Sequence, residues 1–381
     1  MKLFKSLLVA PATLGLLAPI AATANEVTIS DFSPAEQLAI TNSRVDGLEA
    51  RLNNVEAGSF SETTTASFSA DFAVGAVDGK GVTTTVTDGD ETFQATYGFQ
   101  IDLNTSFTGE DSLDISLDAG NGSSTGALSE FDLNGYGSTA GDADKLVVDG
   151  VSYTFPLGST TAFVADNGDG SALFTTACVY GGPSNTLDDC GNVTAGITSG
   201  GLAIGAAYDF DNGFTAAAGA QFVETGIATT GNADSWAANL AYTTDSYGAS
   251  VTYAMVEDSG TGNDSFTALN GYYSFDNGLN ISAGYEVGSL DNAVSTVDET
   301  ESYFIGINGE VGAGELGAAI GTYGTMTEAA GVIPERMMYE AYYSYEVNDG
   351  MTITPLIYTV EGSSSTDNDE TGVMVKTSFS F

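Results

Sequence analysis

Two cysteines carry the most specific covalent chemistry in this sequence. Cys178 and Cys190 lie in one stretch rich in Gly, Asn and Asp, and the chain contains no histidine that could complete a metal site with them. In an exported protein, an oxidising compartment makes a disulfide the default state of such a pair. A disulfide across a loop of this size stabilises a fold by about 3 kcal/mol on the chain-entropy account. We therefore predict a Cys178–Cys190 disulfide, with free thiols as the alternative.

Acidic side chains dominate the ionisable groups. The chain has 51 Asp and Glu against 8 Lys and Arg, which gives a formal net charge of −43. Hydrolytic triads and Asp–His pairs need an imidazole that titrates near neutral pH, and histidine is absent. Paired carboxylates could act as acid and base, but among so many acids some pairing is expected by chance. We predict a protein that is not an enzyme, needs no cofactor and binds no nucleic acid, since nucleic acids require clustered Lys and Arg.

One acidic segment resembles the beginning of a calcium-binding loop. It reads Asp166-Asn167-Gly168-Asp169-Gly170, but it lacks the acidic spacing of an EF-hand and any repeated glycine-rich nonapeptide. The segment is predicted to be a plain acidic turn without a metal. Loose binding of divalent cations by the acidic loops, bridging them to lipid headgroups, is left open.

The first residues indicate the compartment in which these groups work. Lys2 and Lys5 precede a mostly apolar segment, and Ala22-Thr23-Ala24 offers a small-x-small cleavage site. This pattern predicts a secretory signal peptide over residues 1–24. A membrane anchor is the alternative, although the segment holds two prolines and is short for a membrane span.

Residues 25–58 are predicted to form a short coiled coil. Their apolar side chains follow a heptad spacing, with charged residues around them. Helices this short are marginal alone, so self-association is favoured over a single amphipathic helix. The heptad positions are Leu38, Val45, Leu48, Leu52 and Val55.

From Phe60 onward the hydrophobic period changes to two. A strand points successive side chains to opposite faces, so each such segment has one apolar and one polar face. A mean hydropathy near zero fits two opposed faces of this kind. In one clear example, Leu279, Ile281, Ala283, Tyr285 and Val287 alternate with Asn280, Ser282, Gly284 and Glu286.

Short turns and long connections alternate along this part of the chain. Turns such as Asp276-Asn277-Gly278 follow aromatic strand ends such as Tyr273-Ser274-Phe275, which suits an aromatic girdle at one membrane interface. Eight long loops and seven short turns predict 16 strands, with 14 or 18 as alternatives. The predicted fold is therefore all-β: a 16-stranded antiparallel transmembrane β-barrel over residues 59–381. The long loops are expected near 78–91, 119–144, 166–200, 224–234, 257–265, 288–300, 324–337 and 361–370, and the turns near 109–111, 156–158, 211–212, 245–247, 276–277, 309–312 and 348–350.

The last residues of the sequence are predicted to form a strand with alternating side chains. Val373, Val375, Thr377, Phe379 and Phe381 share one face, and Lys376 lies on the other, predicted to point inward. In water such an exposed edge would promote aggregation, so a soluble sandwich is disfavoured. We assign Phe379 and Phe381 a role in membrane assembly.

These features together resemble cyanobacterial outer-membrane porins, which are similar to the carbohydrate-selective porin family. The resemblance covers nearly the whole chain and includes the segment Asn104-Thr105-Ser106-Phe107-Thr108-Gly109 and the terminal Phe381. It implies a trimeric 16-stranded pore. Longer relatives carry an S-layer-homology domain, for which residues 25–58 are too few, so contact with peptidoglycan is left open. The sugar selectivity of the namesake family would need a basic track that this sequence lacks.

The resemblance also gives the third long loop, near 166–200, a role. In general porins this loop folds inward and sets the constriction. Asp166, Asp169, Asp188 and Asp189 are hypothesised to bias the constriction toward cations, and Lys376 and Arg336 are candidates to line the pore opposite them. A solvated surface loop stapled by the disulfide is the alternative.

The predicted function is passive diffusion of ions and small hydrophilic solutes through an outer-membrane porin. Its expected partners are two further copies of the chain, outer-membrane lipid and lipopolysaccharide. A structural or receptor-type barrel without a general open pore is the alternative.

Overall fold

The computed structural model describes residues 64–78, 93–122, 128–131, 133, 144–198, 200–229, 232–258, 262–291, 298–327, 335–362 and 368–381. The chain divides into two compact units, Met1–Ser59 and Phe60–Phe381, and every described residue belongs to the second. The predicted signal peptide and coiled coil lie outside the described residues. Within the described ranges, no helix is long and apolar enough to cross a membrane.

The described part of the barrel unit contains sixteen long strands and one two-residue strand, β14. The long strands coincide with the segments of alternating side chains, as expected. The strands are β1 (Thr64–Asp78), β2 (Gln94–Thr105), β3 (Ser112–Gly120), β4 (Val147–Leu157), β5 (Thr160–Asp166), β6 (Leu202–Asp209), β7 (Phe214–Phe222), β8 (Ser235–Thr243), β9 (Tyr247–Asp258), β10 (Gly262–Ser274), β11 (Leu279–Ser289), β12 (Glu299–Val311), β13 (Gly314–Thr322), β14 (Met326–Thr327), β15 (Met337–Asn348), β16 (Met351–Val360) and β17 (Glu370–Ser380). Short 3₁₀ helices, η3 (Ser129–Phe131) and η5 (Glu224–Gly226), lie in two of the connections.

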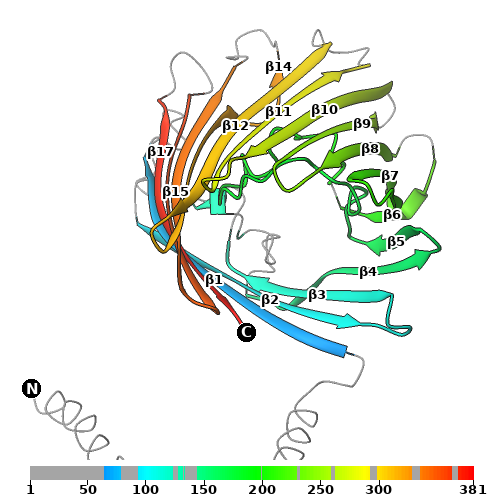
Figure 1. The fold of residues 1–381 in the computed structure, drawn as a ribbon, viewed down its shortest axis with the longest axis horizontal. Coiled ribbons are helices and arrows are strands. Elements are labelled where there is room, and N and C mark those ends of the chain that lie inside the picture. Colours follow the sequence, from blue (N-terminus) through cyan, green and yellow to red (C-terminus); the bar gives the residue numbers. More distant parts are fainter. Residues whose placement is uncertain are drawn as a thin grey trace, which may run out of the picture. The chain divides into compact units, whose positions relative to one another are not determined.

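The sheet closes on itself. Neighbouring long strands pair antiparallel, with β13 pairing directly to β15, and β1 pairs with both β2 and β17. At the seam, Phe68 and Phe381 exchange two backbone hydrogen bonds of 3.0 Å. Closure leaves the sheet without a free edge, and the strands surround an interior in Figure 1. The prediction of a 16-stranded antiparallel barrel is confirmed.

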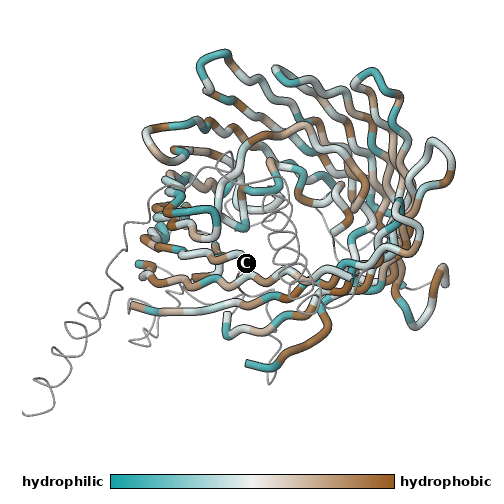
Figure 2. Tube along the Cα trace, turned by 60° about the horizontal axis from the view of Figure 1, so that its bottom comes forward, coloured by the Kyte–Doolittle hydropathy of each residue, from teal (hydrophilic) through white to brown (hydrophobic). Residues whose placement is uncertain are grey.

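The two faces of the wall follow the predicted alternation. On β11, Ile281 and Tyr285 are 37% and 40% exposed on the outside, whereas Ser282 and Glu286 are 0% and 1% exposed on the inside. Hydrophobic residues are frequent along the strands in Figure 2, and hydrophilic ones gather at many of the connections. On β11 the polar face is therefore the lumen face.

The seven predicted short turns all connect the expected strands, but one predicted long loop is wrong. The loop near 257–265 shrinks to three residues, because Asp258 pairs with Gly262 and Glu257 with Asn263. Backbone pairing does not need apolar side chains, so the ladder continues past the end of the apolar pattern. The other seven long connections lie between the expected strands, although the one near 324–337 contains the short strand β14, which pairs with β12.

Aromatic rings pair on the outer wall beside the short turns between β6 and β11. Tyr208 packs on Phe210, and Tyr273 on Phe275, with ring centroids 4.7 Å apart in both pairs. Phe214 packs on Tyr242 at 4.6 Å. The arrangement matches the predicted girdle.

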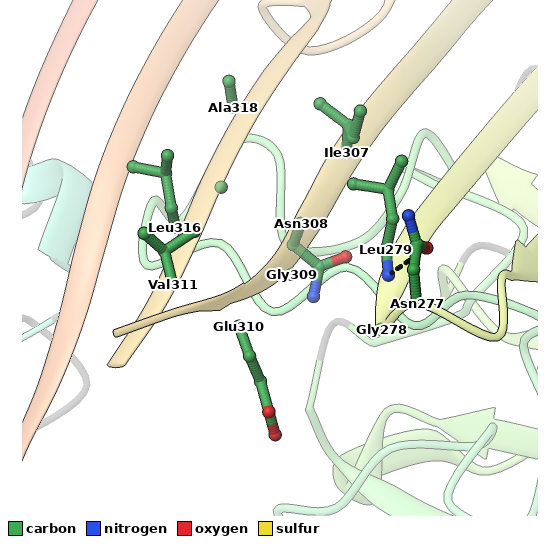
Figure 3. Close-up of a pocket in the computed structure, with 11 residues that line it drawn as sticks. Asn277, Gly278, Leu279, Ile307, Asn308, Gly309, Glu310, Val311, Leu316 and Ala318 are labelled. Carbon is green, nitrogen blue, oxygen red and sulfur yellow. Dashed lines mark hydrogen bonds between the residues drawn. The ribbon is translucent and has the colours of Figure 1, made fainter. Parts of the chain in front are cut away.

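A groove lies on the outer wall at the same end, beside the turn between β10 and β11 (Figure 3). Its apolar side chains are those of Leu279, Ile307, Val311 and Leu316. The last three are 41%, 50% and 49% exposed, whereas Asn308 between them is 3% exposed on the lumen side. The groove is therefore part of the apolar outer surface and not of the interior.

Candidate functional site: the loop inside the barrel

The connection between β5 and β6, residues 167–201, follows the inner wall of the barrel; we call it the inner loop. Its backbone donates to polar side chains that point inward from one strand after another. The N–H groups of Thr175, Ala177 and Val179 reach Asn239 Oδ1 on β8 (3.1 Å), Ser250 Oγ on β9 (2.9 Å) and Ser282 Oγ on β11 (3.1 Å). A buried irregular segment must find such partners, because unpaired backbone groups are costly away from water.

The returning arm of the inner loop is held in the same way. Asn270 Nδ2 on β10 donates to Cys190 O (2.9 Å), and Ser302 Oγ on β12 donates to Gly191 O (2.9 Å). The Cys178–Cys190 disulfide joins the two arms, as predicted, and Cys190 is 2% exposed. The cross-link therefore lies in the lumen, where it closes the tip of the loop.

Further along, Glu286 on β11 binds the loop by its carboxylate. Glu286 Oε2 accepts hydrogen bonds from the backbone N–H groups of Thr194 (2.9 Å) and Ala195 (2.8 Å). Hydrogen bonds to an ionised acceptor are stronger than neutral ones. Glu286 thus holds the returning arm with an acidic side chain, whereas Asn270 and Ser302 hold it with neutral ones.

Two wall glycines let the loop approach the sheet closely. A Cβ atom at Gly219 would lie 1.8 Å from Gly170 O, and one at Gly284 would lie 1.8 Å from Cys190 O. No side chain fits either position while the loop stays in place. The inner wall and the loop are therefore complementary in shape.

One side of the lumen is filled by an apolar core. Tyr180 and Leu187 of the inner loop and Phe131 of η3 pack on inward side chains of β1, β12, β13 and β15–β17. Tyr180 is 5.2 Å from Phe304 and 5.9 Å from Tyr342 between ring centroids. Since η3 lies between β3 and β4, a second connection also folds inward. We call this region the packed side.

Two carboxylates, the buried Glu340 and the half-buried Glu315, give the packed side polar contacts. Tyr180 donates its hydroxyl to Glu340 Oε1 on β15 at 2.6 Å. Tyr342 donates to Glu315 Oε1 on β13 at the same distance. Both hydroxyls are thereby satisfied within the core.

The part of the lumen wall formed by β2–β4, which adjoins β1, is polar and mostly half-exposed. Asp102 Oδ1 accepts hydrogen bonds from Gln100 Nε2 and from Ser116 Oγ, both at 2.7 Å. Asp114 accepts from Ser112 Oγ at 2.7 Å. These five side chains keep intermediate exposure, unlike the fully buried lumen face of β11. We call this region the carboxylate side.

A β-bulge adds one more carboxylate to this side. The pairing of β3 with β4 shifts register between Ser116, whose partner is Gly150, and Leu117, whose partner is Val148. Asp149 is the extra residue, and bulges commonly re-aim a side chain in this way. Asp149 and Asp102 are the charged neighbours of Asp118 on β3.

The four loop aspartates predicted to line the constriction fall in different surroundings. Asp166 lies at the exposed end of β5, beside Glu224, and Asp188 is also exposed. Asp169 faces the carboxylate side, where burial and then the charge of Asp149 raise the pKa of its carboxyl. Burial raises the pKa of Asp189 to about 7, against the lowering effect of the Gly191 N–H, which donates to it at 2.9 Å. Only Asp169 is thus brought together with the wall carboxylates.

The two predicted basic residues do not face these aspartates. Lys376 points inward, as predicted, but its Nζ lies 5.5 Å from the centre of the Phe131 ring on the packed side. Arg336 Nε donates to Glu361 O (2.6 Å), and Arg336 pairs with Glu370 (3.4 Å). Arg336 therefore braces the strand ends around β15 and β17.

The C-terminal aromatics lie on the outer face at the seam. Phe379 meets Phe72 edge to face at 6.2 Å, and Phe381 stacks on Phe68 at 5.7 Å. These contacts join the last strand to the first.

The acidic turn at 166–170 is organised by its backbone. Asn167 has a φ of 52°, and its side chain donates to Asp149 O. Among the described residues, no group of three or more Asp, Glu, Cys or His side chains could hold a metal ion. The segment behaves as a turn.

Comparisons with known proteins agree with this geometry at the level of the fold. No family model and no curated protein matches the sequence. Solved structures do match: a mutant of the Rh. blastica porin (TM-score 0.52, 12% identity, 84% of this chain and 100% of that chain) is one. Others are an anion-selective porin from Comamonas acidovorans (TM-score 0.58, 14% identity, 84% and 99%) and Pseudomonas putida OprB at high pH (TM-score 0.59, 10% identity, 84% and 94%). At these identities the likeness shows the porin fold alone.

Proposed function

We propose that this protein is an outer-membrane porin that lets ions and small hydrophilic solutes diffuse passively. The observation that carries the proposal is the inner loop, which is anchored inside a closed barrel whose outer face is apolar. A barrel of sixteen strands is wide enough to leave an aqueous channel. A loop fixed to its inner wall narrows such a channel without a moving part.

A preference for cations is part of the proposal. The carboxylate side bears Asp102, Asp114, Asp118 and Asp149 on the wall and Asp169 on the inner loop. Acidic side chains that line a pore favour cations. The anion-selective porin among the structural matches shows that this fold does not itself fix the sign of the preferred ion.

The apolar outer wall and the aromatic girdle support insertion in the outer membrane, among lipid and lipopolysaccharide. Export by a cleaved signal peptide and assembly as a trimer belong to the same proposal, on the sequence features and the family resemblance. Phe379 and Phe381 support a role of the last strand in assembly, because their contacts close the ring.

A closed structural or receptor-type barrel is the second candidate, and the packed side favours it, since an apolar core excludes water from part of the lumen. Purified, refolded protein in planar bilayers separates the two candidates. Stepwise single-channel openings support the porin. A correctly folded barrel that inserts without conducting supports the closed barrel.

A further inference from the structure

The lumen has two unlike halves, and only one of them suits a path for ions. On the packed side, Met338, Tyr358 and Met374 are 0%, 2% and 1% exposed, and loop side chains cover them. The lumen faces of β8–β12 are closed over as well, with Thr252, Ser282 and Ser302 each 0% exposed. Most lumen residues of β2–β4 are half-exposed, with Asp118 as a buried exception, so this is the part of the wall that water reaches.

Carboxylates follow one another along this water-facing wall. In the β2–β3 register, Asp114 is opposite Asn104, Asp102 is opposite Ser116, and Asp118 is opposite Gln100. Residues two apart on a strand are about 7 Å apart. The wall thus presents an acidic side chain at roughly every second residue pair from the short-turn end toward the inner loop.

The members of this series nearest the inner loop interact electrostatically. Asp118 has Asp149 and Asp102 as its charged neighbours, and Asp169 of the inner loop has Asp149. The series therefore continues from the wall onto the loop. Like charges held this close repel one another unless a cation or a proton lies between them.

Asp118 is buried, unlike its half-exposed neighbours on this wall, and it carries an acceptor atom that the protein leaves unpaired. The residue is 5% exposed, yet its Oδ1 atom has no hydrogen-bond partner, whereas Asp102 Oδ1 accepts two hydrogen bonds. A buried carboxylate oxygen without a donor is costly, because the protein does not replace the water that it lost. A passing cation would supply the missing partner.

We propose that small cations cross the barrel along the carboxylate side, by way of Asp114, Asp102, Asp118 and Asp149 toward Asp169. The path is eccentric, since the packed side is closed, and the wall of β2–β4 sets the charge selectivity more than the loop tip does. Potassium, sodium and hydrated magnesium are the ligands that this chemistry fits; chloride and anionic solutes are repelled. The inference rests on the proposed porin function and specifies its substrate class.

The test is the potassium-to-chloride permeability ratio, from reversal potentials in a KCl gradient at low ionic strength, where screening is weakest. Asp102→Asn, Asp118→Asn and Asp149→Asn are combined in one variant and compared with the unchanged protein. Glu315→Gln removes one inward carboxylate from the packed side, and it is the control for Asp102→Asn alone, which removes one from the carboxylate side. Heat-modifiable gel mobility confirms that each variant folds.

In the combined variant, the potassium-to-chloride permeability ratio is expected to fall by about fivefold or more. Asp102→Lys should also lower this ratio. Glu315→Gln should leave it unchanged. An unchanged ratio in the combined variant, or an equal loss in Glu315→Gln and in Asp102→Asn alone, would overturn the inference although the protein conducts. A folded protein that never conducts contradicts the porin function itself, so the two failures are distinguishable.

Discussion

Gly284 on β11 lies directly against the carbonyl group of Cys190 in the inner loop. A Cβ atom added at position 284 would be 1.8 Å from Cys190 O, far inside van der Waals contact. The same carbonyl accepts a hydrogen bond from Asn270 on the next strand. The loop is therefore fitted to the wall where the disulfide closes its tip.

Gly284→Val should displace the inner loop without opening the barrel. The added side chain and Cys190 O cannot occupy the same space, and overpacking of this kind typically costs 1–3 kcal/mol, roughly. We expect faster hydrogen exchange at the loop amides and a changed single-channel conductance. Gly271→Ala on the neighbouring strand is the control, because its nearest contact is Gly248 O at 3.3 Å. Equal exchange in both variants would contradict the fit described above.

Glu286→Ala should release the returning arm of the loop. It leaves the N–H groups of Thr194 and Ala195 without their acceptor, and each buried donor left unpaired costs about 1–3 kcal/mol. Hydrogen exchange at residues 194 and 195 should accelerate by at least tenfold. Glu301→Ala removes an exposed carboxylate that accepts a hydrogen bond from Tyr285 on the outer wall, and it should leave those two amides protected.

The stability of the loop should fall as the pH rises through the range set by Asp189. Burial, with Asp188 and Glu286 nearby, raises the pKa of this carboxyl to about 7. Because the folded loop holds a proton that an unfolded Asp has already released above about pH 4, stability declines between about pH 4 and pH 7. Protection of the amides at 188–192 is therefore expected to be greater at pH 5 than at pH 8. Asp189→Asn should flatten this dependence, and a dependence that survives the substitution would assign it to another group.

Loss of the disulfide should loosen the loop but spare the barrel. Replacing both cysteines by serine removes a cross-link worth about 3 kcal/mol to the loop, whereas the sixteen-strand ladder does not include either residue. Limited proteolysis is expected to cut within 179–189 only in the variant, with heat-modifiable mobility unchanged. Loss of the folded band on gels would show that the barrel itself requires the cross-link.

The sequence was sufficient to predict the barrel because its signals are local. The alternation on β11 and turns such as Asp276-Asn277-Gly278 act over a few residues, and so they survive in any barrel context. The long loop predicted at 257–265 is wrong, because Glu257 pairs with Asn263 and the two strands continue beyond the end of the apolar pattern.

The site was only partly predictable because it depends on long-range contacts. The inward direction of Lys376 followed from alternation, but its contact with Phe131 needs the β3–β4 connection to fold into the lumen. Asp102, Asp114 and Asp118 were visible as the polar face of their strands, without any sign that they faced the open half. Asp149 reaches the same side through a β-bulge, and a bulge interrupts the period of two by which lumen residues are predicted from sequence.

Conductance of the refolded protein in planar bilayers decides whether the barrel is an open, cation-preferring pore. We expect stepwise openings with a reversal potential on the cation side. A barrel that shows heat-modifiable mobility and inserts in the bilayer, yet remains silent or prefers anions, would contradict it.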